Sequence, residues 1–239
     1  MGSNRTNWRS VGMILMVAMA ARLMVLWIVI KDYPRGWLYS RGIEMGLLAN
    51  SLVHGHGYSS PFGGSTGPTA FIAPGYPTLV AAVFLIFGSY TVASAIAILL
   101  LQILISVATI WLMMYLCYEI FDARTAKLAG AFWAISPTLL WIPTIFWDTS
   151  ISAGAMAGMI VLALQCNKKP SRALWSVMGA YCGLIALINP ALLPSFLAIM
   201  GWAGYRTWKV SLAGPAIGVL ALLLVFVAWP IRNAYRFHA

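Results

Sequence analysis

Two acidic side chains in apolar surroundings are the first candidates for chemistry. Glu44 stands in YSRGIEMGLLANSLVHGHGYSSPFGGSTGPTAFIAPGYP, residues 39–77, and Asp148 stands in FWDTS. A carboxylate can take a proton from an attacking hydroxyl, or hold a cation that binds phosphate. The plainer alternatives are a solvated charge at Glu44 and a helix N-cap at Asp148, before a helix that begins at Thr149. From the residues alone, both interpretations stay open.

A second set of polar residues could bind phosphate or a metal ion. Arg232 and Asn233 follow an apolar stretch in WPIRNAYRF. A guanidinium is a fixed fork of donors that suits phosphate, and the alternative is an arginine that snorkels to the membrane interface. His54 and His56 alternate in a glycine-rich turn, where they could converge on a metal ion, although two ligands without a third are weak evidence. The alternative is a pair of loop side chains near lipid headgroups or a substrate phosphate.

The composition predicts that lipid is the main solvent of this chain. Of its 239 residues, 62% are hydrophobic and 8% are charged, whereas a soluble domain is about half apolar and about a quarter charged. The net charge is +10, but Lys and Arg are scattered singly between apolar stretches, which is typical of membrane-protein loops and predicts no nucleic-acid partner. Cys117, Cys166 and Cys182 lie in or beside apolar stretches and are expected to be small buried side chains.

The expected fold class is all-α, a polytopic transmembrane helix bundle whose long first outer loop carries interfacial helices. Helices are required because lipid cannot satisfy a free backbone amide. The apolar segment 76–87 is short for a span and is expected to lie along the membrane surface. Residues 1–239 are thus expected to form one membrane domain, with the outer loop at 31–90 and six spans within 91–229. We expect about seven spans in all, at roughly 11–30, 91–118, 126–145, 149–166, 173–188, 190–205 and 211–229.

The distribution of basic residues predicts the orientation. With the N-terminus in the cytoplasm and 76–87 outside the bilayer, nine basic loop residues lie inside and five outside. If 76–87 crossed, the bias would reverse, so the positive-inside rule favours the first arrangement. It places the 31–75 loop, Asp148 and the C-terminus on the outer face, the periplasm in a bacterium. The inner residues are Arg5, Arg9, Arg124, Lys127, Lys168, Lys169, Arg172, Arg206 and Lys209; the outer ones are Lys31, Arg35, Arg41, Arg232 and Arg236.

The first outer loop divides into a helix and a polar return. Apolar residues at three- and four-residue spacing predict a helix from Ile43 to Val53, with a stripe formed by Ile43, Leu47, Leu48 and Leu52. GHGYSSPFGGSTGP then predicts a hydrogen-bond-rich turn, and Asn189-Pro190 predicts a tight turn later in the chain. Glu44 is therefore expected on a surface helix, with a polar loop returning over it.

These segments together resemble a known family. IEMGLLANSLVHGHGYSSPF resembles the first outer loop of the GT-C membrane glycosyltransferases, and GPTAFIAPGYPTLVAAVFLIFG resembles the proline-rich strap and amphipathic helix that follow it. SPTLLWIPTIFWDTSISA resembles the second outer turn, and GLIALINPALLPSF and WPIRNAYRF resemble later helices and a span ending. The order and spacing cover nearly the whole chain. The similarity is to the bacterial branch related to protein O-mannosyltransferases and lipid A aminoarabinose transferases.

The resemblance implies an enzyme of the inner membrane that transfers a sugar from a polyprenyl-phosphate-linked donor. The acceptor would be a lipid, glycan or protein on the outer face, and transfer would invert the anomeric centre. The family's first-loop acid, a base or acceptor-orienting group, falls on Glu44, and its second-loop acid falls on Asp148. Arg232 is a candidate phosphate ligand through the matching R-N pair, and Arg22 and Arg41 are candidates by position only.

The sequence departs from the family in two respects. Many members carry Asp-Glu or Asp in the first loop, whereas Ile43 precedes a single Glu44 here, which leaves a base, an acceptor ligand and a divalent-metal ligand as alternatives. Members also run about twice this length, so the resemblance predicts that these 239 residues are an N-terminal part. The competing functions are a non-enzymatic multi-pass protein, such as a transporter or lipid-flipping subunit, and an inactive fragment of the transferase.

Overall fold

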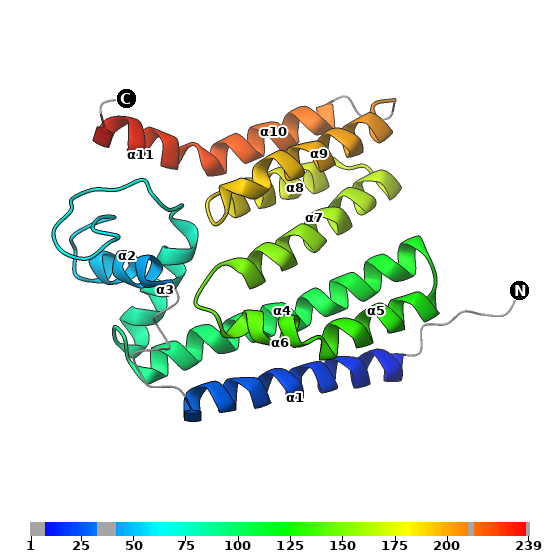
Figure 1. Ribbon diagram of the computed structural model, residues 1–239. Helices are drawn as coiled ribbons and strands as arrows, with labels where there is room; N and C mark the ends of the chain where they lie inside the picture. Colours follow the sequence, from blue (N-terminus) through cyan, green and yellow to red (C-terminus); the bar gives the residue numbers. More distant parts are fainter. Residues whose placement is uncertain (1–7, 33–41, 210–212, 238–239) are drawn as a thin grey trace, which may run out of the picture. The chain divides into compact units, whose positions relative to one another are not determined.

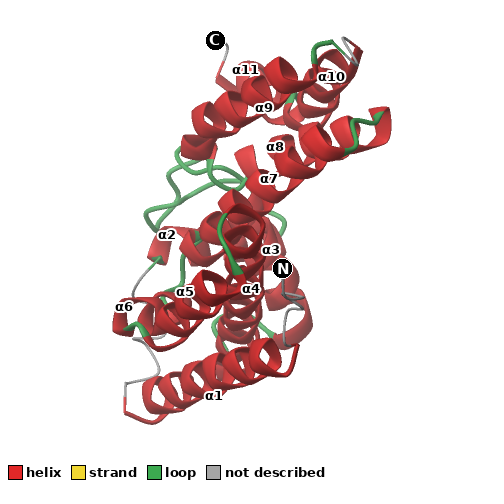
Figure 2. Cartoon of the chain, turned by 90° about the vertical axis from the view of Figure 1, so that its right-hand side faces the viewer, coloured by secondary structure: helices red, strands yellow, loops and turns green. Residues whose placement is uncertain are grey.

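A computed structural model describes residues 8–32, 42–209 and 213–237, and these residues fold into helices joined by loops (Figure 2). The described chain divides into two compact units. Unit 1 comprises 1–42 and 90–157, and unit 2 comprises 43–89 and 158–239. The described helices, in chain order, are α1 Trp8–Asp32, α2 Ile43–Val53, α3 Gly75–Phe87, α4 Val92–Ile120, α5 Ala123–Ile135, α6 Pro137–Trp141, η2 Ile142–Thr144, α7 Thr149–Lys168, α8 Arg172–Ala186, η3 Pro190–Leu192, α9 Leu193–Thr207, α10 Ala213–Phe226 and α11 Ala228–Phe237.

Three of the described helices are long and apolar enough to cross a membrane, and a fourth span is formed if the bent pair α10 and α11 counts as one. The three are Arg9–Lys31 within α1, Val92–Ile120 and Thr149–Lys168. Their lengths agree with the spans expected at 11–30, 91–118 and 149–166. The expected total of seven is not confirmed, because α5, α8 and α9 contain 13, 15 and 15 residues. A helix of 15 residues rises about 22 Å, less than the ~30 Å of hydrocarbon in a bilayer.

The expected span at 126–145 is interrupted by proline. Helix α5 ends at Ile135, Ser136 has an extended backbone, and α6 begins at Pro137. Proline lacks an amide hydrogen and restricts the residue before it, so a helix usually stops there. The apolar composition runs through this break, and composition alone therefore suggested one continuous helix.

Unit 1 is packed around α1, α4 and α5, which lie side by side in both views (Figure 1, Figure 2). Two apolar clusters join these helices. One contains Leu26, Val29, Ala95, Leu99 and Ile103, and the other contains Val11, Ala18, Ile110, Met114 and Ala134.

Unit 2 is held together by close packing at glycines. A Cβ atom added to Gly179 of α8 would overlap the carbonyl oxygen of Gly218 in α10, and one added to Gly214 would meet the buried ring of Trp175. Small residues allow helix backbones to approach closely, which is the usual device where lipid removes the hydrophobic driving force between helices. At the other end of α8, the Gly75 amide donates to the Leu187 carbonyl at 2.7 Å, so α3 begins against the end of α8.

The loop helices have the expected limits. The described α2 spans Ile43–Val53, and α3 spans Gly75–Phe87 against the predicted 76–87. Within the predicted apolar stripe of α2, Leu48 is buried, Leu47 and Leu52 are half-buried, and Ile43 is 53% exposed. The buried face consists instead of Met45, Gly46, Leu48, Ala49 and Ser51. The turn predicted at Asn189 is confirmed, since its side chain accepts a bond from the Ala191 amide at the start of η3.

Candidate functional site

The loop that follows α2 in unit 2 folds back on this helix through hydrogen bonds of its hydroxyls and carbonyls. Ser51 donates to the Gly57 carbonyl at 2.9 Å, and its oxygen lies 2.8 Å from that of Ser59. Ser59 donates to the His56 carbonyl at 3.1 Å. Gly55 and Gly57 have φ angles of +76° and +71°, a left-handed backbone that glycine adopts without strain. The HGHG sequence therefore forms a tight return at the end of α2.

Two limbs of the same loop then pair with each other. The Ser60 amide donates to the Gly67 carbonyl at 3.0 Å, and the Thr69 amide donates to the Tyr58 carbonyl at 3.2 Å. An isolated antiparallel bridge joins Ser59 to Pro68. The segment between the limbs is consequently a small closed loop.

A cavity of about 560 Å³ lies between α2 and this closed loop. Its wall carries serine hydroxyls, the amide of Asn50 and the imidazole of His56, with Leu47 as its large aliphatic side chain. The remaining lining residues are Ser51, Ser59, Ser60, Gly63, Gly64, Ser65, Gly67 and Pro68. Closely spaced neutral donors and acceptors, set among apolar carbon atoms of the wall, suit a ligand that presents both hydroxyl and C–H groups.

Arg232 of α11 ties this loop to the end of the unit 2 helices. One guanidinium nitrogen, Nη1, donates to the Thr69 carbonyl at 2.7 Å and to the Asn233 side-chain oxygen at 2.8 Å. The other, Nη2, donates to the Tyr58 carbonyl at 3.0 Å. The guanidinium carbon also lies 5.7 Å from the centre of the Tyr58 ring and 5.0 Å from that of Trp229, within the range of a cation–π contact. We call this set of contacts the Arg232 clasp.

Tyr58 anchors the loop from its other side. Its hydroxyl lies 2.9 Å from the Ile72 carbonyl and 3.1 Å from the Ala73 carbonyl, as donor to both, and its ring meets the Trp229 ring edge to face at 5.1 Å. Burial raises the pKa of the Tyr58 phenol above its usual value, and the charge of Arg232 opposes that rise in part. The phenol therefore stays protonated and keeps donating well into the alkaline range.

Glu44 lies in the first turn of α2 and is half-buried. A carboxylate there interacts favourably with the positive end of the helix dipole. Glu44 is not among the residues that line the loop cavity. Its position in the first turn is as expected, but its chemical role stays a prediction.

The two histidines lie in the tight return immediately after α2. The Nδ1 atom of His54 lies 2.8 Å from the Asn50 carbonyl oxygen. Because a carbonyl can only accept, Nδ1 carries the hydrogen in this bond. The rings of His54 and His56 stack with centroids 6.4 Å apart, and His56 lines the cavity. Among the described residues, no group of three His, Cys, Asp or Glu side chains could hold a metal ion.

Asp148 belongs to unit 1 and is buried, 4% exposed, immediately before α7. Its carboxylate accepts from the Ser152 hydroxyl at 2.9 Å, and its carbonyl accepts the Ser152 amide at 2.9 Å. Asp148 thus has the place expected of a residue at the start of a helix. The bond that its side chain makes is to a hydroxyl four residues on.

Arg22 is fully buried in α1 of unit 1, and its guanidinium donates five hydrogen bonds. Nε donates to the Ser106 hydroxyl at 2.9 Å, and Nη1 donates to the carbonyls of Ala18 at 3.1 Å and Ala134 at 3.3 Å. Nη2 donates to the carbonyls of Trp133 at 3.4 Å and Leu139 at 3.3 Å. The expectation that Arg22 needs a polar partner is confirmed. All five N–H donors are used within unit 1, so this geometry favours a structural role over substrate binding.

Gln102, in α4 of unit 1, is a buried polar residue near Asp148 whose contacts could not be predicted from the sequence. It is 1% exposed, and its Nε2 donates to the Ile145 carbonyl at 3.0 Å and the Pro143 carbonyl at 3.4 Å. It therefore steadies the segment that leads to Asp148. A lone glutamine in an apolar span was the available signal, since a polar side chain in lipid is costly without a partner. Tyr58 and Ser51 were missed as well, and only their place among polar loop residues marked them.

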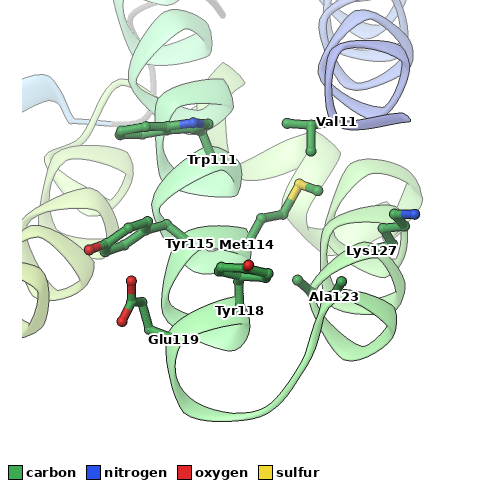
Figure 3. A pocket seen from close by; sticks show the side chains of 9 residues that line it. Val11, Trp111, Met114, Tyr115, Tyr118, Glu119, Ala123 and Lys127 are labelled. Atoms are coloured by element: carbon green, nitrogen blue, oxygen red, sulfur yellow. The ribbon is translucent and has the colours of Figure 1, made fainter. Parts of the chain in front are cut away.

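A second hollow, of about 200 Å³, lies in unit 1 and differs in its chemistry (Figure 3). Trp111, Met114, Tyr115 and Tyr118 project from α4, and Val11 approaches from α1. Glu119 and Lys127 also line it, beside Ala123 and Ala126. Its wall is mostly apolar and aromatic, so it suits a hydrocarbon chain better than a sugar.

Arg41 lies outside the described residues. The other candidates fall into local groups: Arg232 with Asn233 and His54 with His56 in unit 2, and Arg22 and Asp148 in unit 1 without a bond between them. Glu44 belongs to unit 2 and Asp148 belongs to unit 1.

Comparison with protein-family models, curated proteins and solved structures found no match to this chain.

Proposed function

We propose that this chain transfers a sugar from a polyprenyl-phosphate-linked donor to an acceptor on the outer face of a bacterial inner membrane. The observation that carries the proposal is the polar cavity in the first outer loop, in a chain whose other described elements include at least three helices apolar enough for a bilayer. A cavity lined by serine hydroxyls, an amide and an imidazole offers neutral hydrogen bonds of the kind that a sugar can use. The motif resemblance names the donor class, and the cavity supplies a place for the sugar.

The proposed reaction is a single displacement at the anomeric carbon. The acceptor oxygen forms a bond to that carbon while the bond from the carbon to the phosphate oxygen breaks. The polyprenyl phosphate leaves with the electron pair, and a carboxylate takes the proton of the acceptor hydroxyl. We assign the role of proton acceptor to Glu44, because of the resemblance and because Glu44 lies in the first turn of α2. Asp148 takes the supporting role that the resemblance gives to the second-loop acid.

The Arg232 clasp supports a role at the leaving phosphate. Nη1 makes two bonds and Nη2 makes one, so two of the five guanidinium N–H donors have no partner among the described residues. Arginine binds phosphate oxygens with paired donors, which would lower the free energy of the charge that develops on the leaving group. The same side chain would then hold the loop and meet the phosphate.

Replacement of the two carboxylates tests the proposal. The chain is reconstituted in lipid vesicles with a polyprenyl-phosphate hexose, and release of polyprenyl phosphate is followed for wild type, Glu44→Gln and Asp148→Asn. Loss of a general base should lower the turnover rate by about 100-fold or more. Asp122→Asn is the matched control, because Asp122 is an exposed N-cap of α5, bonded to the Thr125 amide. Full turnover in both site variants, or none in the wild type, would contradict the proposal.

The proposed topology has seven crossings, a cytoplasmic N-terminus and the cavity loop outside. Single cysteines at Ser65 and Lys169, both exposed, report on it in a background without Cys117, Cys166 and Cys182. A membrane-impermeant thiol reagent should label Ser65→Cys on intact spheroplasts and Lys169→Cys only after permeabilisation. Labelling of both sites on intact spheroplasts would refute this topology.

A further inference from the structure

Unit 1 contains a small cavity, open on the side of Thr149 and Ala153, beside the hydrogen-bond network of Arg22. Its volume is about 40 Å³, and its wall includes Ser106 of α4 and the first two residues of α7, Thr149 and Ser150. Trp133 and Leu139, whose carbonyls accept from Arg22, also line it, with Thr109, Ile142 and Ala153. About 10 to 15 Å³ of such space holds one water molecule, so this cavity has room for about three waters or for one larger ion.

Ser150 points to a ligand in this cavity. Its side chain is 3% exposed, and its hydroxyl oxygen is buried without a hydrogen-bond partner among the described residues. A buried polar atom that lacks a partner destabilises the fold, and such atoms are rare. A ligand that accepts a hydrogen bond from Ser150 would remove this destabilisation.

The donors around the cavity favour a negative ligand. Ser106 accepts from Arg22 Nε, so its own hydrogen is left to donate, and no described residue takes it. The Thr109 hydroxyl already donates to the Ile105 carbonyl at 2.8 Å. The cavity also borders the first turn of α7, where the positive end of the helix dipole attracts anions. Two free hydroxyl donors and a helix N-terminus therefore face one small space.

Arg22 supplies a positive charge beside the cavity. Arg22 is 0% exposed in a helix that is apolar enough to cross a membrane, and every one of its five acceptors is an uncharged oxygen. Asp148 precedes α7 but does not line the cavity, and its carboxylate accepts from Ser152. A charge in a low-dielectric interior is costly unless a counter-charge lies near it.

We propose that this cavity binds one monoatomic anion of halide size, held by Ser150, Ser106 and the first turn of α7, with Arg22 as the nearby positive charge. The site is separate from the proposed transfer of sugar, since its space is far smaller than the 560 Å³ loop cavity. It anchors the start of α7, and with it the residue before that helix, Asp148.

Anion-dependent stability of the full chain in detergent tests the proposal without any transfer assay. Thermal unfolding is followed by tryptophan fluorescence in sodium gluconate, sodium chloride and sodium bromide at constant sodium concentration. Chloride and bromide should raise the Tm by about 5 °C when present at about 100 times the Kd. Equal Tm values in chloride and gluconate would overturn the proposal, because a cavity that holds water only has no preference between the salts.

Two substitutions of Ser150 test whether the chloride-dependent rise in Tm comes from this cavity. Ser150→Ala removes one donor to a charged ligand and should raise the apparent Kd for chloride about tenfold or more. Ser150→Val fills part of the cavity and should abolish the chloride response while the variant still unfolds cooperatively in gluconate. Ser176→Ala is the matched control, since Ser176 donates to the Arg172 carbonyl of its own helix in unit 2. Equal chloride responses in Ser150→Ala and Ser176→Ala would assign the anion to another site and overturn the proposal.

Discussion

Arg22 in unit 1 and Arg232 in unit 2 show two ways in which this chain uses an arginine. Arg22 is completely buried, and its five donors are all taken by carbonyls and one hydroxyl. Arg232 is half-buried, makes three bonds, and lies against aromatic rings. The first arginine caps the end of a helix inside a bundle. The second holds a loop to a helix, and two of its N–H donors have no partner among the described residues.

The difference follows from the acceptors that each arginine meets. Trp133 and Ala134 belong to the last turn of α5, where carbonyls lack partners within the helix and form the negative end of the dipole. Arg22 satisfies them where water would otherwise be needed. The carbonyls of Tyr58 and Thr69 belong to a loop, so Arg232 determines the closure of that loop rather than the packing of helices. The comparison predicts that loss of Arg22 affects all of unit 1 and that loss of Arg232 affects the loop.

The largest expected effect is that of Arg22→Lys. An ammonium carries three donors on a point charge and cannot span acceptors on α1, α4, α5 and α6, so several buried carbonyls would lose their partner. We expect a loss of about 3–5 kcal/mol in the free energy of unfolding, the usual result of removing one partner of a buried charged group. Thermal or denaturant unfolding in detergent measures it.

Arg172→Lys is the control for that experiment. Arg172 is exposed at the first residue of α8, so its replacement should leave the unfolding midpoint within experimental error. A midpoint for Arg22→Lys that equals the midpoint for Arg172→Lys would show that the five bonds contribute little to stability.

Arg232→Lys should have a smaller effect that is confined to the loop. The lysine keeps the charge but loses the paired donors to Tyr58 and Thr69, at an expected cost of about 1–2 kcal/mol for this half-buried group. Since about 1.4 kcal/mol is a factor of ten in an equilibrium constant, limited proteolysis between 55 and 70 should accelerate about tenfold. Arg236→Lys, an exposed change on the same helix, should leave the rate of cleavage unchanged. Equal acceleration of cleavage by both variants would show that the Arg232 clasp does not hold the loop.

Much of this arrangement could be predicted from the sequence where the signal is local. The limits of α2 were predicted correctly, because apolar spacing ends where HGHG begins, and the turn at Asn189 was predicted from the Asn-Pro pair. The burial cost of Arg22 was predicted as well, since a charge within an apolar stretch needs a partner.

The remainder depends on residues that are distant in the chain. Four of the five acceptors of Arg22 lie 84 to 117 positions away, and Arg232 meets a loop 163 to 174 positions before it. Such separations carry no periodic signal. The break at Pro137 was hidden because apolar residues continue on both sides of it. The cavity at Ser150 could not be predicted either, because a void arises from packing and not from composition.

Tyr58→Phe sharpens the comparison by removing one contact and keeping the clasp. The phenylalanine ring can retain the edge-to-face contact with Trp229, but the carbonyls of Ile72 and Ala73 lose the phenol donor. We expect a cost of about 1 kcal/mol, seen as a Tm lower by about 2–4 °C. Faster proteolysis of the loop should accompany it, with a smaller increase than in Arg232→Lys. An increase larger than that of Arg232→Lys would make Tyr58, and not the arginine, the main anchor.

The smallest effect is expected at the other end of α5, where Asp122 caps the helix in solvent. Its carboxylate accepts the Thr125 amide, and this bond lowers the pKa of Asp122 below the ordinary value. A lowered folded-state pKa contributes stability that is present above the unfolded pKa of about 4 and is lost as the pH falls through the folded value. The Tm should therefore drop as the pH falls below about 5. The Tm of Asp122→Asn should drop less, because asparagine can still accept the amide but does not titrate. Identical pH profiles for the two proteins would mean that the cap on the exposed end of α5 adds nothing, whereas the arginine at its buried end supports the unit.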